Sequence, residues 1–252
     1  TLVVIPSRLS ATRLPGKPLL KINGISIISH VFKKAERANI GEVIVAAEDQ
    51  EIIEDVKKNG GNAILTGKNH KTGTDRIHEA LSLLDREDID FIMNIQGDEP
   101  EIDTNDIINL DNKMKTNNSK IGTLAAKISN SKMYQDENVV KVKIKQSFEI
   151  NPFPNADYFE RKTEDKRFTY HHIGIYCYAV ETLKKFVSFG QSRNEIKNRL
   201  EQLRALDNDI NINVALAKFS PIGVDTKEDY LAIKKIMEYK QKWVKFIFKE
   251  LM

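Results

Sequence analysis

The chain has 252 residues, and its 39 lysines and arginines against 36 aspartates and glutamates leave a formal net charge of only +3. Hydrophobic residues make up 40% of the sequence, which is enough for a buried core, and the mixture of both charges excludes a mainly disordered chain. The small, dispersed positive excess also argues against a nucleic-acid-binding protein.

Cysteine content and hydropathy bear on the cellular compartment. Cys177 is the single cysteine, which excludes an intramolecular disulfide and a cysteine-rich zinc site. No run of 18 apolar residues predicts a membrane span, and the first residues lack the basic and apolar segments of a secretion signal. From these features we expect a cytoplasmic protein.

The first half of the chain alternates short β-branched segments with amphipathic ones. Strands are predicted at 2–5, 42–47, 62–66, 90–95 and 121–128. Apolar residues at helical spacing predict helices between them, with apolar faces at 27–35, 52–56, 77–84 and 107–110. This alternation predicts a largely parallel sheet covered on both faces, in which ligands bind beyond the carboxyl ends of the strands.

The pattern changes after Asn138. Strands are predicted at 139–145, 173–180 and 214–219, and a polar, proline-containing segment at 151–167 separates the first two. Helices are predicted at 195–206 and from Thr226 onward. Because no low-complexity linker interrupts the chain, we expect one α/β domain with a smaller inserted lobe.

A basic loop follows the first predicted strand. The segment PSRLSATRLPGKPL places Arg8, Arg13 and Lys17 within ten positions, together with Gly16 and three prolines. Guanidinium and ammonium groups at this end of a strand suit a polyphosphate, because they neutralise its charge through directed hydrogen bonds. The loop is not a P-loop, since Pro18 follows the lysine. A solvated basic turn is the alternative, and the stiffening prolines favour the binding site.

Two acidic segments are candidates for a metal site. The segment MNIQGDEP, residues 93–100, ends an apolar strand in Gln96, Gly97 and Asp98, and GVDTKED, residues 223–229, places Asp225 before a helix. Magnesium prefers one or two carboxylates together with phosphate oxygens. Either aspartate can instead form a turn or cap a helix.

The segment HKTGTDRI, residues 70–77, precedes a predicted helix. Thr72, Gly73 and Arg76 can contact a base or a ribose there. A simple helix cap at Thr74 or Asp75 is the better interpretation of this segment in isolation.

Two further groups of polar residues stand in the second half. His171 and His172 precede the strand IGIYCY, where histidines are more often structural than ligands. Residues 195–204 carry charges at helical spacing, which is typical of a solvated ion-pair face.

Taken together, six segments resemble the 3-deoxy-manno-octulosonate cytidylyltransferase family in order and spacing, over most of the chain: IPSRLSATRLPGKPL, HKTGTDR, NIQGDEP, HHIGIYCY, LEQLRAL and GVDTKED. The resemblance implies a glycosyltransferase-A-like α/β fold of the nucleotide-diphospho-sugar transferase type, with a mixed, mostly parallel central sheet flanked by helices. It implies a reaction of CTP with 3-deoxy-manno-octulosonate (Kdo), giving CMP-Kdo and pyrophosphate for lipopolysaccharide biosynthesis. It also implies magnesium and a cytoplasmic homodimer.

The resemblance divides the single domain, residues 1–252, into three parts. These are a nucleotide-binding half at 1–130, a sugar-binding and dimerisation subdomain at about 131–220, and a C-terminal helix at 221–252. The helix is apolar at Ile236, Met237, Trp243, Val244, Phe246 and Ile247 and rich in lysine. A basic amphipathic helix can lie on a membrane, but a helix that covers the core or a dimer partner is more common.

The resemblance also assigns roles to individual residues. Catalysis falls to Arg8, Lys17, Asp98 and Asp225, and the two aspartates are the implied magnesium ligands. The implied nucleotide contacts are Arg8, Arg13, Lys17, Thr72, Gly73, Arg76 and Asp98. The implied sugar contacts are Gln96, Arg161, His172, Glu195 and Glu201.

Three positions depart from the pattern of the family. The family segment YFSR reads YFER at residues 158–161, with a short, charged continuation, and Asn198 replaces a glutamate of the sugar-side helix. Glu48 stands where the family usually has threonine. These changes affect the predicted affinity for the sugar more than the predicted binding of the triphosphate. Two alternative functions therefore stay open: a CMP-sugar synthetase for another acidic sugar, and a non-catalytic homologue that binds CTP.

Overall fold

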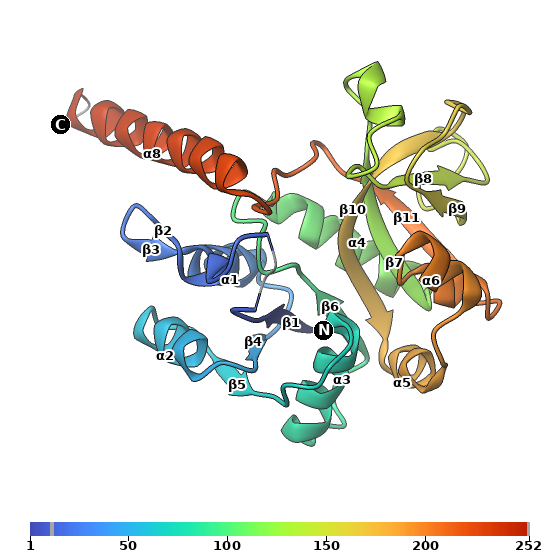
Figure 1. Cartoon of the computed structure of the whole chain (residues 1–252), viewed down its shortest axis with the longest axis horizontal. Coiled ribbons are helices and arrows are strands. Elements are labelled where there is room, and N and C mark those ends of the chain that lie inside the picture. Colours follow the sequence, from blue (N-terminus) through green and yellow to red (C-terminus); the bar gives the residue numbers. More distant parts are fainter. Residues whose placement is uncertain (11–12, 251–252) are drawn as a thin grey trace.

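A mixed sheet runs through the molecule, with helices on both faces (Figure 1). The structure is a computed structural model that describes residues 1–10 and 13–250, without the side chains of 241–242 and 244–250. The strands are β1 (Leu2–Ser7), β2 (Lys21–Ile22), β3 (Ile25–Ser26), β4 (Val43–Ala47), β5 (Ala63–Leu65), β6 (Phe91–Asn94), β7 (Ile121–Ala126), β8 (Lys141–Ile144), β9 (Ala156–Glu160), β10 (Thr169–Ala179) and β11 (Ile212–Leu216). The helices are α1 (Ile27–Ala38), α2 (Gln50–Lys58), α3 (Gly73–Leu84), α4 (Thr104–Asn117), α5 (Val180–Ser188), α6 (Arg193–Asn198), α7 (Leu203–Leu206) and α8 (Lys227–Glu250).

The main sheet has the strand order β11-β7-β10-β6-β1-β4-β5. Its strands are parallel except for β10, which is antiparallel to both β6 and β7. The predicted mixed, mostly parallel sheet is therefore confirmed. The carboxyl ends of β1, β4, β6 and β7 lie at the same edge of the sheet.

Both faces of the sheet are buried because alternate strand residues point to opposite sides. Val3 and Ile5 of β1 pack in a core with α1, α2 and α4, whereas Leu2 and Val4 pack in a second core with α3 and α5. This explains why the strands read as continuous apolar runs in the sequence.

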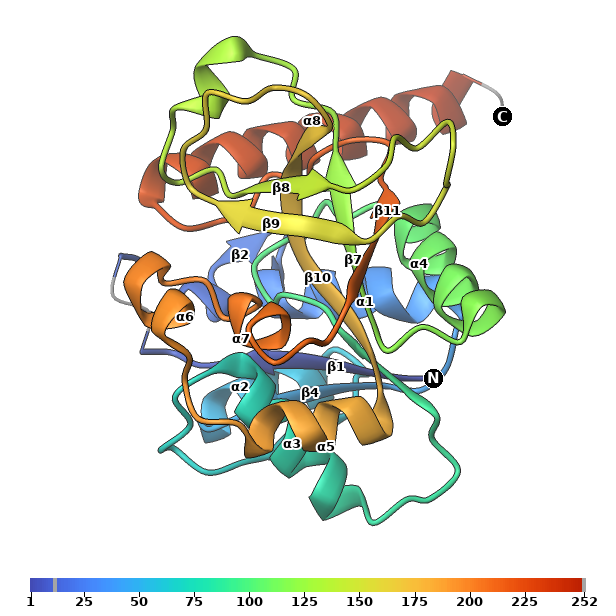
Figure 2. The same ribbon diagram turned by 90° about the vertical axis from the view of Figure 1, so that its right-hand side faces the viewer.

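Strand β10 joins the main sheet to a small lobe. It pairs with β7 over residues 171–178, with β6 over 176–179 and with β8 over 169–171, and β8 in turn pairs with β9 (Figure 2). The register of β10 against β7 shifts between Ile173 and Tyr176. The Thr123 hydroxyl lies against this irregularity, 2.7 Å from the Ile175 carbonyl oxygen and 3.1 Å from Nε2 of His172.

Most of the predicted elements are confirmed, but the predicted helix at 195–206 is wrong. It is broken into α6 and α7 because Arg199 adopts the left-handed conformation, with φ of 54°. The sequence patterns also missed β2, β3, β9 and α5. Strand β9 lies within the polar segment at 151–167, and Ala156 and Phe159 are the buried residues of this strand.

Helix α8 packs against the rest of the molecule near its start and then projects away from it (Figure 1). Ile233 and Met237 contact the cluster formed by Ile22, Ile27 and Val224. Trp243 is 54% exposed, and the side chains of Val244, Phe246 and Ile247, on which the predicted amphipathic face depends, lie outside the described residues. Within the described ranges, no helix combines the length and apolar character needed to cross a membrane.

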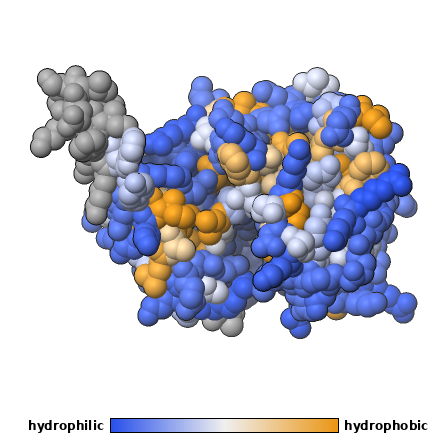
Figure 3. All heavy atoms as spheres, turned by 90° about the horizontal axis from the view of Figure 1, so that it is seen from above, coloured by the Kyte–Doolittle hydropathy of each residue, from blue (hydrophilic) through white to orange (hydrophobic). Residues whose placement is uncertain are grey.

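The surface seen from above is mostly hydrophilic, and apolar side chains gather in patches around a hollow near its centre (Figure 3).

The buried Thr123 hydroxyl predicts a measurable contribution to stability. In Thr123→Val the shape is kept but the Ile175 carbonyl loses its donor, so we expect a loss of about 2 kcal/mol in the free energy of unfolding. Thr123→Ser keeps the hydroxyl and removes one methyl group, at a cost of about 1 kcal/mol. Urea denaturation measures both. A Thr123→Val protein at least as stable as Thr123→Ser would contradict this role.

Candidate active site

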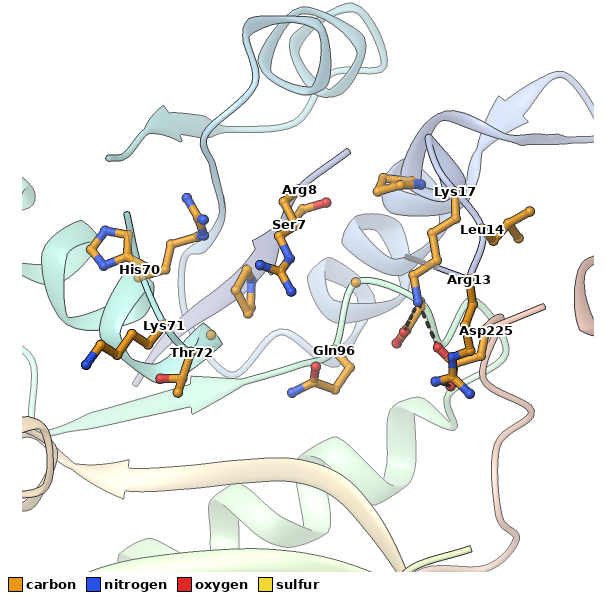
Figure 4. Close-up of a pocket in the computed structure, with 16 residues that line it drawn as sticks. Ser7, Arg8, Arg13, Leu14, Lys17, His70, Lys71, Thr72, Gln96 and Asp225 are labelled. Atoms are coloured by element: carbon orange, nitrogen blue, oxygen red, sulfur yellow. Dashed lines mark hydrogen bonds and ion pairs between the residues drawn. The ribbon is translucent and has the colours of Figure 1, made fainter. Parts of the chain in front are cut away.

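A cavity of about 370 Å³ opens at the carboxyl ends of β1 and β6, the edge of the sheet at which we expect a ligand. It is lined by all the residues assigned to the nucleotide and to catalysis: Arg8, Arg13, Lys17, Thr72, Gly73, Arg76, Asp98 and Asp225. The close-up shows the cavity as elongated. Arg13, Lys17 and Asp225 lie at one end, His70, Lys71 and Thr72 at the other, and Arg8 between them (Figure 4).

The basic loop after β1 is held by hydrogen bonds to neighbouring segments. The Leu9 amide donates to Oδ2 of Asp49 at 2.7 Å, and the Gly16 amide donates to the Leu9 carbonyl at 3.0 Å. Gly16 has φ of 71°, a left-handed conformation that favours glycine. It starts the short 3₁₀ helix Lys17–Leu19, so the turn sets the direction of the Lys17 side chain.

Lys17 joins the two candidate metal ligands. Its Nζ lies 2.6 Å from Oδ2 of Asp98 and 3.1 Å from Oδ1 of Asp225, and Arg13 pairs with the second oxygen of Asp225 at 2.8 Å. Burial opposes the ammonium charge, but the two carboxylates outweigh burial and raise the pKa of Lys17. One wall of the cavity is therefore a compact cluster of two cations and two carboxylates.

The structure does not support the capping interpretation of Asp225, whereas Asp98 does lie in a turn. Helix α8 is capped by Thr226 and Asp229, whose side chains and amides exchange hydrogen bonds at 2.9 and 3.2 Å. Asp225 therefore faces the cavity. The Val224 amide donates to the Asp98 carbonyl at 2.9 Å, which brings both aspartates to the same place.

Gly97 allows the end of β6 to pass close to the end of β1. A β-carbon at Gly97 would lie 3.1 Å from the Pro6 carbonyl oxygen and 3.0 Å from Cδ1 of Ile28. A side chain at this position would require the Pro6 carbonyl or the Ile28 side chain to shift by a few tenths of an ångström.

Glu99 lies behind this cluster and is not equivalent to the two aspartates. Its Oε2 is buried and makes no hydrogen bond within the described chain. Burial and the neighbouring charges of Asp98 and Asp225 raise the pKa of Glu99 to about 8. Such a carboxyl group is mostly protonated at neutral pH.

The opposite end of the cavity is the amino terminus of α3. Thr72 caps this helix through a reciprocal pair of bonds with Asp75, so the cap is not at Thr74 or Asp75 as the sequence suggested. Arg76 is buried, donates to the Thr66 hydroxyl at 2.6 Å and to the Gly67 carbonyl at 3.0 Å, and pairs with Glu48. Its guanidinium is therefore already bound to protein groups, although the residue lines the cavity.

A second cavity, of about 260 Å³, adjoins the first, and Gln96 lines both. Of the predicted sugar contacts, Gln96, His172 and Glu201 line the second cavity. Gln96 is oriented by a 3.1 Å hydrogen bond from its amide nitrogen to the Gly174 carbonyl. The pKa of His172 is lowered to about 3, mainly by burial and to a smaller extent by the neighbouring His171. The ring is therefore neutral.

Tyr176 is a lining residue that the sequence analysis missed. Its hydroxyl and Oε1 of Glu201 are buried, and neither has a hydrogen-bond partner among the described residues. The sequence did contain a pattern from which Tyr176 could have been predicted to line the site. In the strand IGIYCY, alternate residues point to the same side, so Tyr176 and Tyr178 share one face of β10.

Two predicted sugar contacts do not line either cavity. Glu195 forms a buried ion pair with Arg204, with atoms 2.5 and 2.8 Å apart, and both residues are only 3% exposed. The prediction of a solvated ion-pair face is therefore wrong for this pair. Arg161 donates to the main-chain carbonyls of Glu137, Asn198 and Arg199.

Comparisons with known proteins show which family the chain resembles. A family model described as Cytidylyltransferase matches residues 2–212. The chain is 40% identical to the 3-deoxy-manno-octulosonate cytidylyltransferase of Thermodesulfovibrio yellowstonii, over 94% of this chain and 98% of the relative, and 42% identical to that of Nitrobacter winogradskyi, over 94% of each. A solved structure of CMP:2-keto-3-deoxy-manno-octonic acid synthetase complexed with CTP superposes with a TM-score of 0.85, at 33% identity, over 95% of this chain and 98% of that one.

The buried, neutral His172 predicts a pH dependence of stability. The unfolded chain binds a proton on this histidine below pH about 6.5, whereas the folded protein binds it only near pH 3. The folded state therefore loses stability as the pH falls from about 6.5 towards 3. We expect His172→Gln to lose less stability than the wild type over this range, as measured by urea denaturation at each pH. Parallel curves for the two proteins would show that His172 does not contribute.

Proposed function

The chain belongs to the 3-deoxy-manno-octulosonate cytidylyltransferase family, and from this premise we propose that it transfers CMP from CTP to the anomeric hydroxyl of Kdo. The single observation that carries the proposal is the pair of adjoining cavities at the carboxyl ends of the strands. One has a cationic end suited to a triphosphate, and the other has uncharged and acidic hydrogen-bonding groups suited to a polyhydroxylated sugar.

The first cavity accounts for the nucleotide. Arg8, Arg13 and Lys17 would neutralise the triphosphate at one end, while the amino terminus of α3 receives the nucleoside at the other. Arg8 is exposed and has no hydrogen-bond partner in the described part of the chain, so it is available to a phosphate. Arg76 bonds to Thr66 and Glu48, and in this way it would hold the wall of the first cavity in place.

The reaction needs little covalent chemistry from the protein. The anomeric oxygen of the sugar attacks the α-phosphorus in line and loses its proton to solvent as the new P–O bond forms. The bond from the α-phosphorus to the bridging oxygen breaks, and pyrophosphate leaves. Lys17 and Arg8 would stabilise the charge that develops on the leaving group, and Gln96, at the junction of the cavities, would orient the sugar.

The donor set of the site fits magnesium. Two carboxylates, Asp98 and Asp225, face one cavity and are held together by a cation, and magnesium takes one or two carboxylates together with phosphate oxygens. When bound, magnesium would neutralise the phosphates, orient the α-phosphate from the Asp98 side and acidify the attacking hydroxyl from the Asp225 side.

The same family membership supports a cytoplasmic homodimer that serves lipopolysaccharide biosynthesis, with residues 131–220 as the sugar-binding and dimerisation part. Light scattering of the purified protein measures the mass directly. A mass of one chain at micromolar concentration would contradict the dimer and leave the proposed reaction unaffected.

Pyrophosphate release from CTP and magnesium tests the proposed function, with Kdo, with N-acetylneuraminate and with no sugar. We expect release only with Kdo. Release only with the other acidic sugar would move specificity to the altered segment at 158–167. CTP binding without release under any condition would identify a non-catalytic homologue.

The two aspartates predict a loss of turnover on conservative substitution. Asp98→Asn and Asp225→Asn keep the shape of the site but remove a charge from the cluster around Lys17, so we expect kcat to fall about a hundredfold or more for each. Asp88→Asn, a change at an exposed surface ion pair with Arg86, is the matched control and is expected to keep full activity. Wild-type turnover in either site variant at saturating magnesium would refute the assigned role.

A further inference from the structure

The far half of helix α8, residues 236–250, presents an apolar face to solvent. Ile236, Tyr239 and Trp243 are 37%, 64% and 54% exposed. They follow one another at spacings of three and four residues, so they share one side of the helix. The residues that pack α8 against the body, Ile233 and Met237, are buried on a neighbouring side. Helix α8 therefore has two apolar sides, one of which faces the body and the other solvent.

The body leaves this face open because the helix extends away from it. Within the described ranges, Met237 is the last residue of α8 in a hydrophobic cluster, and Lys240 pairs with Glu101. The helix continues to Glu250 and projects away from the rest of the molecule (Figure 1). At about 1.5 Å per residue, the part beyond Lys240 is about 15 Å long. This length is enough for the helix to lie against a second surface.

The same part of the chain concentrates positive charge. Residues 234–252 contain six lysines and two glutamates, a formal net charge of +4, whereas the whole chain has a net charge of +3. Two copies of the helix that met along this part would bring the lysines of both copies together, which like-charge repulsion opposes. An anionic surface would neutralise these lysines, so the charge favours an anionic partner over a second copy.

The residue types on the apolar face distinguish a lipid surface from other anionic partners. Tyr239 and Trp243 have large apolar rings with one polar group each, and such side chains are enriched where the hydrocarbon of a bilayer meets water. Lysines beside them can keep their methylene groups in the apolar layer and extend the ammonium group to lipid phosphates. A nucleic acid would engage the lysines and leave Ile236 in water. The combination is typical of a helix that lies in the plane of a membrane interface.

We propose that the far half of α8 is a membrane-surface anchor, which docks the protein reversibly on bilayers that contain anionic phospholipid. The apolar face enters the interface, and the lysines contact the headgroup phosphates. The helix lies on the membrane and does not cross it. Because α8 begins two residues after Asp225, docking holds the first cavity within roughly 36 Å of the lipid surface. This proposal does not depend on the reaction proposed above.

The test uses the fluorescence of Trp243, which is the single tryptophan of the chain and so reports on the anchor directly. We would record emission spectra and co-sedimentation with vesicles of phosphatidylcholine alone and of equal parts of phosphatidylcholine and phosphatidylglycerol. With the anionic vesicles we expect emission at shorter wavelength, because the indole leaves water, and at least about tenfold more bound protein. High salt should reverse both effects. Unchanged emission, or equal binding to both kinds of vesicle, would overturn the proposal.

Two variants separate the apolar contribution from the charge. Trp243→Ser should lower co-sedimentation with the anionic vesicles about tenfold, and Lys235→Gln, which removes one exposed charge, about fivefold. Leu83→Ser, at an equally exposed apolar residue of α3, and Lys57→Gln, at an exposed lysine of α2, are the matched controls and should bind as the wild type does. A control that loses as much binding as its matched variant would overturn the proposal.

A second copy of the chain is the other occupant that the experiment tests. If the face served self-association, the emission would shift as the protein concentration rises without lipid, and light scattering would show an increase in mass that Trp243→Ser abolishes. That result would overturn the proposal. An equal shift with polyglutamate, which supplies negative charge without hydrocarbon, would overturn it as well, because the partner would then be any acidic chain.

Discussion

One ammonium group holds together parts of the chain that are far apart in sequence. Lys17 bonds to Asp98, 81 residues away, and to Asp225, 208 residues away, and so joins the loop after β1, the end of β6 and the start of α8. Without this cation two carboxylates would face each other in one cavity. The requirement for a positive charge between them couples the stability of the site to its chemistry, because the same charge is the group that a triphosphate needs.

The parallel part of the fold could be predicted from sequence because both faces of the sheet are buried. Strands such as β1 and β4 then appear as uninterrupted apolar runs, and the helices between them show one apolar face each. The strands of the small lobe were harder to predict, because fewer of their residues are apolar. In β9, Asp157 and Tyr158 are exposed, and only Ala156 and Phe159 mark a strand. The break between α6 and α7 depends on the left-handed conformation of Arg199. Because this residue is neither glycine nor asparagine, no local sequence pattern predicts the break.

The same division holds for the site. That the residues of the first cavity lie together was predictable, because charged residues stand directly at the ends of apolar strands and these ends meet at one edge of the sheet. The surroundings of Arg161 were not predictable, because its partners are backbone carbonyls, which every residue has and which leave no mark in the sequence. Glu195 and Arg204 were expected in solvent because spacing along a helix does not show what covers the helix.

The most direct test of the central claim is calorimetric titration of CTP with magnesium into the wild type, Lys17→Met and Lys57→Met. Lys57 is exposed on α2 and serves as the control for loss of one positive charge. We expect Lys17→Met to weaken CTP binding at least about tenfold, because charge-assisted bonds are lost, and Lys57→Met to bind CTP as the wild type does. Equal affinity in Lys17→Met and the wild type would contradict the assignment of this cavity to the nucleotide.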